Sequence, residues 1–75
     1  MSIENEIKQI RQQALLSQTE FASELGVSFS TVNRWENGKS KPNYKALQAI
    51  ESFCNKKGLD ISVKELWRIV EDEIH

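Results

Sequence analysis

Hydrophobic residues recur every three or four positions along the chain, in five successive segments. The segments cover residues 3–14, 17–25, 28–37, 43–57 and 62–74. This spacing gathers the hydrophobic side chains on one face of an α-helix. The five faces consist of Ile3, Ile7, Ile10 and Ala14; Phe21, Ala22 and Leu25; Val32 and Trp35; Ala46, Leu47, Ile50, Phe53 and Cys54; and Val63, Leu66, Trp67, Val70 and Ile74. No segment alternates as a strand does, so the pattern predicts an all-α fold with five helices.

Capping residues mark the ends of these predicted helices. Ser17 and Glu20 match a capping box, in which each side chain accepts a hydrogen bond from the other residue's backbone amide. A second box at residues 62–65 opens the fifth helix, and Ser28 and Asn43 cap the third and fourth. Many helices end at a residue in the left-handed conformation, which glycine adopts at the least cost. The predicted helix ends are Gly26, Gly38 and Gly58.

The length of 75 residues predicts one domain that covers residues 1–75. A single cysteine cannot form an intramolecular disulfide, and no hydrophobic run approaches the roughly 20 residues that span a bilayer. The first residues are acidic and lack a signal-peptide pattern. We therefore expect a cytoplasmic protein.

Charge is unevenly distributed around a net value of −1. Residues 27–57 hold six lysines and arginines and two glutamates, a net charge of +4, whereas the segments on either side are negative. Phosphate affinity depends on the local field and not on the total charge. The positive middle is compatible with nucleic-acid binding and equally with solvated lysines that have no partner.

Residues 17–42 carry the most specific pattern in the chain. Two short capped helices are separated by Gly26-Val27-Ser28, the tight connection of a helix-turn-helix. The segments LSQTEFA (16–22), LGVS (25–28) and TVNRWENGK (31–39) resemble the phage-repressor/Cro-like family, also called the xenobiotic-response-element type. The resemblance extends over residues 3–66. It implies a five-helix, lambda-repressor-like DNA-binding domain with a helix-turn-helix core at about 17–38, whose third helix reads bases in the major groove.

The resemblance also implies roles for individual residues. The base-reading residues on the exposed face of the third helix are Phe29, Ser30, Asn33 and Arg34. The residues on DNA phosphates are Gln18, Thr31, Lys39, Lys41 and, through the amides that begin the fourth helix, Asn43 and Tyr44. Arg11 and Glu36 match an internal ion pair of several relatives.

The chemistry of two residues fits base reading independently of the resemblance. Arg34 can donate two parallel hydrogen bonds to guanine O6 and N7, and Asn33 can bond adenine N6 and N7. The chain also departs from the family at two positions. Leu15 stands where relatives commonly have Gly or Asn, and Phe29 stands where they often carry a polar base reader. Phe29 has two open interpretations, contact with a thymine methyl and simple packing.

Residues for other functions are missing from the sequence. The one histidine is His75, so no His/Cys metal site can be built, and there is no nucleophile–base set or Gly-rich phosphate loop. We expect no enzyme, no cofactor and no metal. The sequence predicts a transcriptional repressor that binds double-stranded DNA sequence-specifically, without a sensor domain and controlled by abundance or by a partner protein. The alternatives are the antitoxin of a toxin–antitoxin pair and a protein–protein adaptor with the same fold.

The fifth predicted helix bears on oligomeric state. Together with Ile69 outside its main face, it carries more hydrophobic side chains than one small core covers. One module also touches too few bases to find a site alone, which favours a homodimer on a two-fold operator. The alternative is that this helix only closes the core.

Overall fold

The described part of the computed structural model is helical and contains no strand; it comprises residues 2–59, 66–68 and 71. The all-α class is confirmed. The four helices with defined bounds are α1 (Ile3–Gln13), α2 (Gln18–Leu25), α3 (Phe29–Glu36) and α4 (Tyr44–Lys57). Residues 66–68 and residue 71 are also helical. The second capping box, at 62–65, lies outside the described residues, as do Val63, Ile69, Val70 and Ile74.

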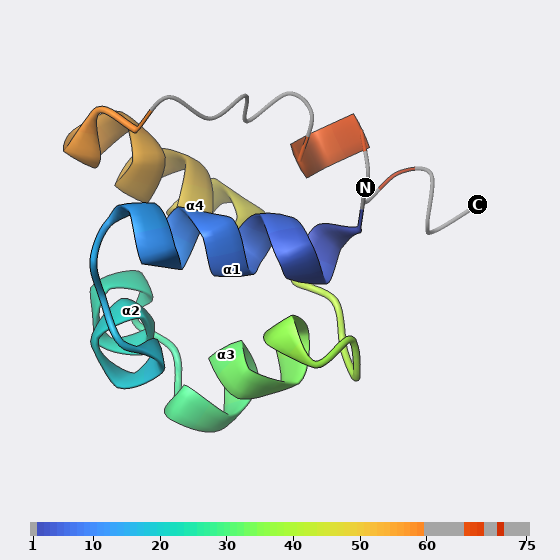
Figure 1. Ribbon diagram of the computed structural model, residues 1–75. Helices are drawn as coiled ribbons and strands as arrows, with labels where there is room; N and C mark the ends of the chain where they lie inside the picture. Colours follow the sequence, from blue (N-terminus) through green and yellow to red (C-terminus); the bar gives the residue numbers. More distant parts are fainter. Residues whose placement is uncertain (1, 60–65, 69–70, 72–75) are drawn as a thin grey trace.

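Helix α1 crosses the middle of the molecule, with α2 and α3 on one side of it and α4 on the other (Figure 1). Helix α1 packs on α3, and α2 packs on both α3 and α4. Among the described residues, no helix is both long and apolar enough to cross a membrane.

Within the described residues, the hydrophobic faces predicted from the sequence meet in one core. Its buried members are Ile3, Ile7, Ile10, Phe21, Ala22, Val32, Trp35, Leu47, Ile50, Phe53, Cys54 and Leu66. Each fully buried Leu, Ile or Phe side chain contributes about 1.5–3 kcal/mol relative to an exposed one. The interior fixes α3 through Val32 and Trp35. Burial, together with the neighbouring charge of Glu51, raises the pKa of the Cys54 thiol, which packs as a small apolar group.

The predicted caps of α2, α3 and α4 are present. The Ser17 hydroxyl accepts from the Glu20 amide at 3.1 Å, while the Glu20 carboxylate accepts from the Ser17 amide at 2.9 Å. Ser28 and Asn43 each accept a hydrogen bond from the amide three residues later. The structure also shows a cap at Ser2, which the sequence pattern did not predict.

The predicted end of α3 was one residue too late. The helix ends at Glu36, because Asn37 leaves the helical region at φ −97° and ψ 4°. The following residue, Gly38, has the left-handed φ of 71°. The short loop that follows leads to the cap of α4.

All four helices end in the same kind of turn. A residue with positive φ donates its amide to the carbonyl three residues back, and the next residue donates to the carbonyl five residues back. The positive-φ residues are Leu15, Gly26, Gly38 and Gly58. The turn after α1 therefore places a leucine where the other three place glycine.

Candidate nucleic-acid interface

The turn between α2 and α3 has the geometry that the sequence predicted for a helix-turn-helix. Gly26 adopts φ 74°, and Val27 donates to the Ala22 carbonyl at 3.0 Å while its side chain packs partly against the core. Ser28 then caps α3 by accepting from the Thr31 amide at 3.2 Å. Three consecutive residues thus fix the reversal of the chain, and this reversal sets the angle between α2 and α3.

Helix α3 has one buried face and one exposed face. Val32 and Trp35 are buried, whereas Ser30 and Arg34 are exposed and Phe29 retains 49% of its accessible surface. Phe29 is thus half exposed at the start of α3, and both interpretations of this residue, contact with a thymine methyl and packing, stay predictions. The exposed side of α3 offers a guanidinium, a hydroxyl and an aromatic ring on a helix held from behind.

Arg11 and Glu36 form a bidentate pair between α1 and α3. Arg11 Nε lies 2.7 Å from Glu36 Oε2, and Arg11 Nη2 lies 3.0 Å from Oε1. The side chains are 15% and 4% exposed. The hydrogen bond to Glu36 raises the pKa of Arg11, and burial opposes it with a smaller effect. A third bond, from Arg11 Nη1 to the Leu16 carbonyl at 3.0 Å, ties the pair to the turn before α2.

Two of the predicted DNA-contacting residues also bond to each other. Gln18 donates from Nε2 to Glu36 Oε1 at 3.1 Å, and its Oε1 accepts from Asn33 Nδ2 at 3.1 Å. Asn33 Oδ1 in turn accepts from Asn37 Nδ2 at 3.1 Å. Sequence reasoning placed Gln18 and Asn33 on separate parts of the DNA and did not include Asn37. The spacing of four between Asn33 in α3 and Asn37, the residue directly after the helix, was the available signal.

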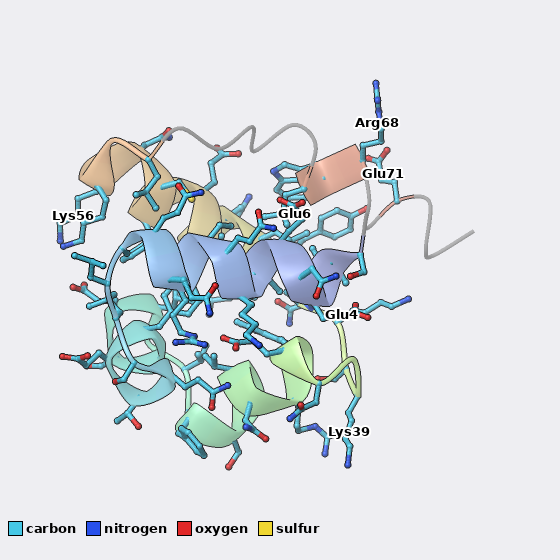
Figure 2. All side chains as sticks on the ribbon, in the orientation of Figure 1. Glu4, Glu6, Lys39, Lys56, Arg68 and Glu71 are labelled. Atoms are coloured by element: carbon cyan, nitrogen blue, oxygen red, sulfur yellow. The ribbon has the colours of Figure 1, made fainter. Side chains whose placement is uncertain are left out.

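Two of the lysines, Lys39 and Lys56, lie at distant places on the surface. Lys39 follows α3, where its amide donates to the Arg34 carbonyl at 2.9 Å, and its exposed side chain points away from the body of the domain (Figure 2). Lys56 lies near the other end of the molecule, at the end of α4 (Figure 2). Of Lys39 and Lys56, Lys39 lies on the same side of the molecule as α3, and Lys56 does not (Figure 2).

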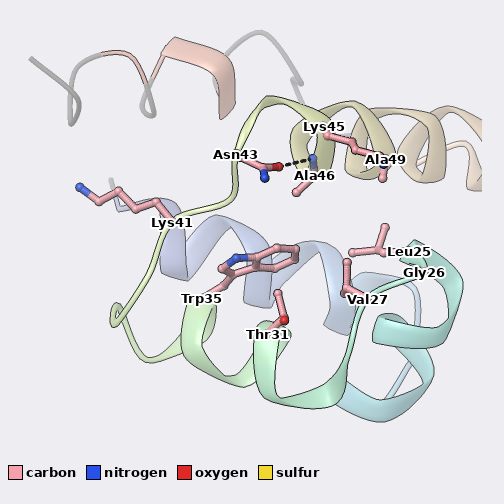
Figure 3. Close-up of a pocket in the computed structure, with 10 residues that line it drawn as sticks. All are labelled: Leu25, Gly26, Val27, Thr31, Trp35, Lys41, Asn43, Lys45, Ala46 and Ala49. Atoms are coloured by element: carbon pink, nitrogen blue, oxygen red, sulfur yellow. Dashed lines mark hydrogen bonds between the residues drawn. The ribbon is translucent and has the colours of Figure 1, made fainter.

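A hollow of about 440 Å³ separates α3 from the beginning of α4 (Figure 3). Its lining residues are Leu25, Gly26, Val27, Thr31, Trp35, Lys41, Asn43, Lys45, Ala46 and Ala49. The structure thus gathers Thr31, Lys41 and Asn43, three of the predicted phosphate contacts, around one depression. The Thr31 hydroxyl lies 2.9 Å from that of Ser28.

Tyr44 lies at the start of α4 with 58% of its surface exposed. Its ring stacks on that of Trp67, with 5.3 Å between the centroids and 21° between the planes. Trp67 Nε1 also donates to Glu51 Oε2 at 3.1 Å. The Tyr44 side chain therefore contacts the C-terminal segment on one face, and the DNA contact predicted at this position is that of its backbone amide.

The comparisons with known proteins agree with this geometry. A family model described as Helix-turn-helix matches residues 7–61. The chain is 34% identical over 53 residues to the HTH-type transcriptional activator BcrR of Enterococcus faecalis. The match covers 71% of this chain but only 26% of that relative, so the chain spans about a quarter of its length. No solved structure matches the chain. Because this family model covers more than half of the chain, the chain belongs to the helix-turn-helix family of the Cro/C1 type.

Proposed function

We propose that this chain binds double-stranded DNA sequence-specifically and regulates transcription, with α3 in the major groove. The observation that carries the proposal is the division of α3 into two faces. Val32 and Trp35 anchor it in the core, while Arg34 and its exposed neighbours face solvent. The major groove of B-DNA admits an α-helix, and reading bases requires a helix that is held rigidly from behind.

The exposed residues of α3 suit particular base edges. The Arg34 guanidinium can donate two parallel hydrogen bonds to guanine O6 and N7. Phe29 offers apolar contact to a thymine methyl, and Ser30 can bond several bases. Asn33 completes the proposed base-reading set.

The proposed phosphate contacts surround α3. Gln18 opens α2, Thr31 and Lys41 line the hollow beside α3, and Lys39 extends from the loop that follows it. The first amides of α4, at Asn43 and Tyr44, add the positive end of a 14-residue helix. These contacts orient the domain without reading sequence.

We further propose that one domain, residues 1–75, acts as a homodimer, because a single module contacts too few bases for a selective site. We expect repression from this domain, since occupying a promoter requires only the DNA-binding surface. The relative is named as an activator. A reporter gene with the site placed inside its promoter measures the direction of regulation.

Selection of binding sites from random duplex DNA tests the function. We expect a defined palindromic motif, which supports both sequence-specific binding and the two-fold arrangement. The absence of any enriched motif would contradict the proposal and favour the protein–protein adaptor. Co-purification with a toxin, whose inhibition is the chain's main effect, would instead identify an antitoxin.

Titrations of variants at several salt concentrations then separate base reading from phosphate binding. Arg34→Ala should cost about 1–3 kcal/mol on the selected site and little on random duplex. Lys39→Ala should weaken both duplexes about equally and lower the salt slope by about 1 per protomer. Lys56→Ala is the matched control, since Lys56 lies at the far end of α4, and it should change neither quantity. Equal weakening of both duplexes by Arg34→Ala would assign Arg34 to phosphate.

A further inference from the structure

We propose that Glu36 is a positioning residue for base recognition, although its side chain is buried. Acting through Gln18, it fixes the direction of a chain of amide hydrogen bonds and thereby holds Asn33 in the orientation that suits adenine. This inference rests on the proposed function, because it concerns how the same interface selects a base.

The direction of this series of hydrogen bonds follows from the charged pair at its end, Arg11 and Glu36. A guanidinium only donates hydrogen bonds and a carboxylate only accepts them. Glu36, paired with Arg11, can therefore bond Gln18 only through the Gln18 amide nitrogen. This turns the Gln18 carbonyl toward Asn33, which must present its own nitrogen and leave its oxygen to Asn37. A chain of neutral amides without such an end could reverse every member by a 180° flip.

The hydrogen-bond donor and acceptor that remain free for DNA on the Asn33 side chain, among the described contacts, are the reason why we choose adenine. An amide side chain has two N–H donors and two lone pairs on its oxygen. Within the described residues, one donor bonds Gln18 and one lone pair bonds Asn37. One donor and one acceptor remain. Adenine requires that combination, since its N7 accepts and its N6 donates, whereas guanine presents two acceptors in the major groove.

Burial keeps Glu36 away from DNA and protects the hydrogen bonds through which it acts from replacement by water. Its side chain is 4% exposed and lies behind Gln18, so it has little surface with which to touch DNA. Gln18 and Asn33 are themselves partly buried, which limits the replacement of their mutual bond by water. The buried charge thus acts on base selection only through the orientation of the two amides.

The test begins with the base that Asn33 reads. Asn33→Ala identifies the base pair of the selected site at which discrimination is lost, and we expect adenine there. At that base pair, Glu36→Gln should reduce the preference for adenine by about tenfold, while binding to random duplex stays unchanged. Glu20→Gln is the matched control, because it makes the same chemical change at an exposed glutamate outside the chain of amides. It should leave the preference unchanged.

A second variant covers the case in which Glu36→Gln does not fold. Gln18→Met removes the link between Glu36 and Asn33 while leaving the Arg11–Glu36 pair in place. Loss of a Gln18 phosphate contact would weaken all duplexes equally, whereas loss of orientation lowers the adenine preference specifically. An unchanged preference in this variant, equal weakening of every duplex, or a base other than adenine at that position would each overturn the inference.

NMR of the free protein separates this inference from the proposed function. In the unmodified protein the side-chain NH₂ signals of Gln18 and Asn33 should exchange slowly with water, and in Glu36→Gln the Asn33 signals should exchange faster. Equal exchange in both proteins would overturn the inference without reference to DNA. If the unmodified protein selected no site, the proposed function would be contradicted. The exchange experiment would still show whether Glu36 orients the two amides, because it contains no DNA.

Discussion

The turn after α1 and the turn after α2 follow the same backbone path with different residues. Each has a left-handed residue, then a partly buried hydrophobic residue, then a serine that caps the next helix. The left-handed residues are Leu15, with φ 60°, and Gly26, with φ 74°. The difference that matters for strain lies at the left-handed position, which holds a leucine in the first turn and a glycine in the second.

The two turns are therefore stabilised in different ways. A left-handed residue other than glycine costs about 1–2 kcal/mol, and the Leu15 side chain, which is 89% exposed, recovers little of this through burial. Arg11 compensates by donating to the Leu16 carbonyl while it also pairs with Glu36. The second turn relies on the residue type of Gly26. A tertiary contact thus holds one turn, and a local preference holds the other.

Breaking the tertiary contact should give the largest effect. Arg11→Met leaves the Glu36 carboxylate without its cation and removes the bond to Leu16, so we expect a loss of about 3 kcal/mol in the free energy of unfolding. Urea denaturation measures it. Lys8→Met, at an exposed position of the same helix, is the control and should change stability little. A loss below about 1 kcal/mol, the value of an exposed pair, would show that the contact does not hold the turn.

Placing leucine in the second turn should reproduce the strain of the first without its compensation. Gly26→Leu should cost about 1–2 kcal/mol. A Cβ at Gly26 meets no atom within 4 Å, so the cost comes from the backbone and not from a clash. Gly58→Leu, at a similar φ and in equally open space, should cost the same. Unequal urea midpoints for the two variants would mean that the surroundings, and not φ, set the cost.

Relieving the strain in the first turn should stabilise the protein by a smaller amount. We expect Leu15→Gly to raise the free energy of unfolding by roughly 1 kcal/mol, because the gain in the turn is partly offset by the greater freedom of glycine in the unfolded chain. Leu15→Ala tests the cause, since it removes the side chain but keeps the strain. If Leu15→Ala stabilises as much as Leu15→Gly in thermal denaturation, exposed hydrophobic surface and not backbone strain is responsible.

The helices could be predicted from the sequence because their signals are local. The hydrophobic face of α1 and the caps at Ser17, Ser28 and Asn43 each involve residues a few positions apart, and helical geometry fixes how such residues meet. The turn at Gly26 was predictable for the same reason. Glycine at the end of a predicted helix indicates a positive φ, because glycine adopts that conformation at the least cost.

Other features depend on how the helices pack and could not be predicted. Leucine itself gives no sign of positive φ, because it rarely adopts it; the one signal was that relatives commonly have Gly or Asn at the position of Leu15. Gln18 and Asn33 are 15 positions apart, and their bond depends on the angle at which α2 crosses α3. The same holds for the stacking of Tyr44 on Trp67, which required the position of the C-terminal segment. The sequence therefore supplied candidate site residues and the Arg11–Glu36 pair, but not the hydrogen bonds that join Gln18, Asn33 and Asn37.

The two turns also differ in how the stability of the helix that follows depends on pH. This difference is the smallest effect that we expect. The third residue of α2 is Glu20, whereas the corresponding residue of α3 is Thr31, which does not titrate. The hydrogen bond from the Ser17 amide, with a smaller contribution from the Ser17 hydroxyl, lowers the pKa of Glu20. A lowered pKa in the folded state gives stability that is present above the unfolded value of about 4.3 and is lost as the pH falls through the folded value.

Glu20→Gln keeps the capping geometry without the charge, so it isolates this contribution. We expect the unmodified protein to be slightly more stable than Glu20→Gln at pH 6, and the difference in free energy of unfolding to shrink as the pH falls below about 4. Other carboxylates titrate in both proteins and cancel in the difference. Thr31→Val is the control for the second turn, and its difference from the unmodified protein should not depend on pH. Parallel pH profiles for the unmodified protein and Glu20→Gln would mean that the charge of Glu20 does not stabilise α2, and that the two helix starts are equivalent.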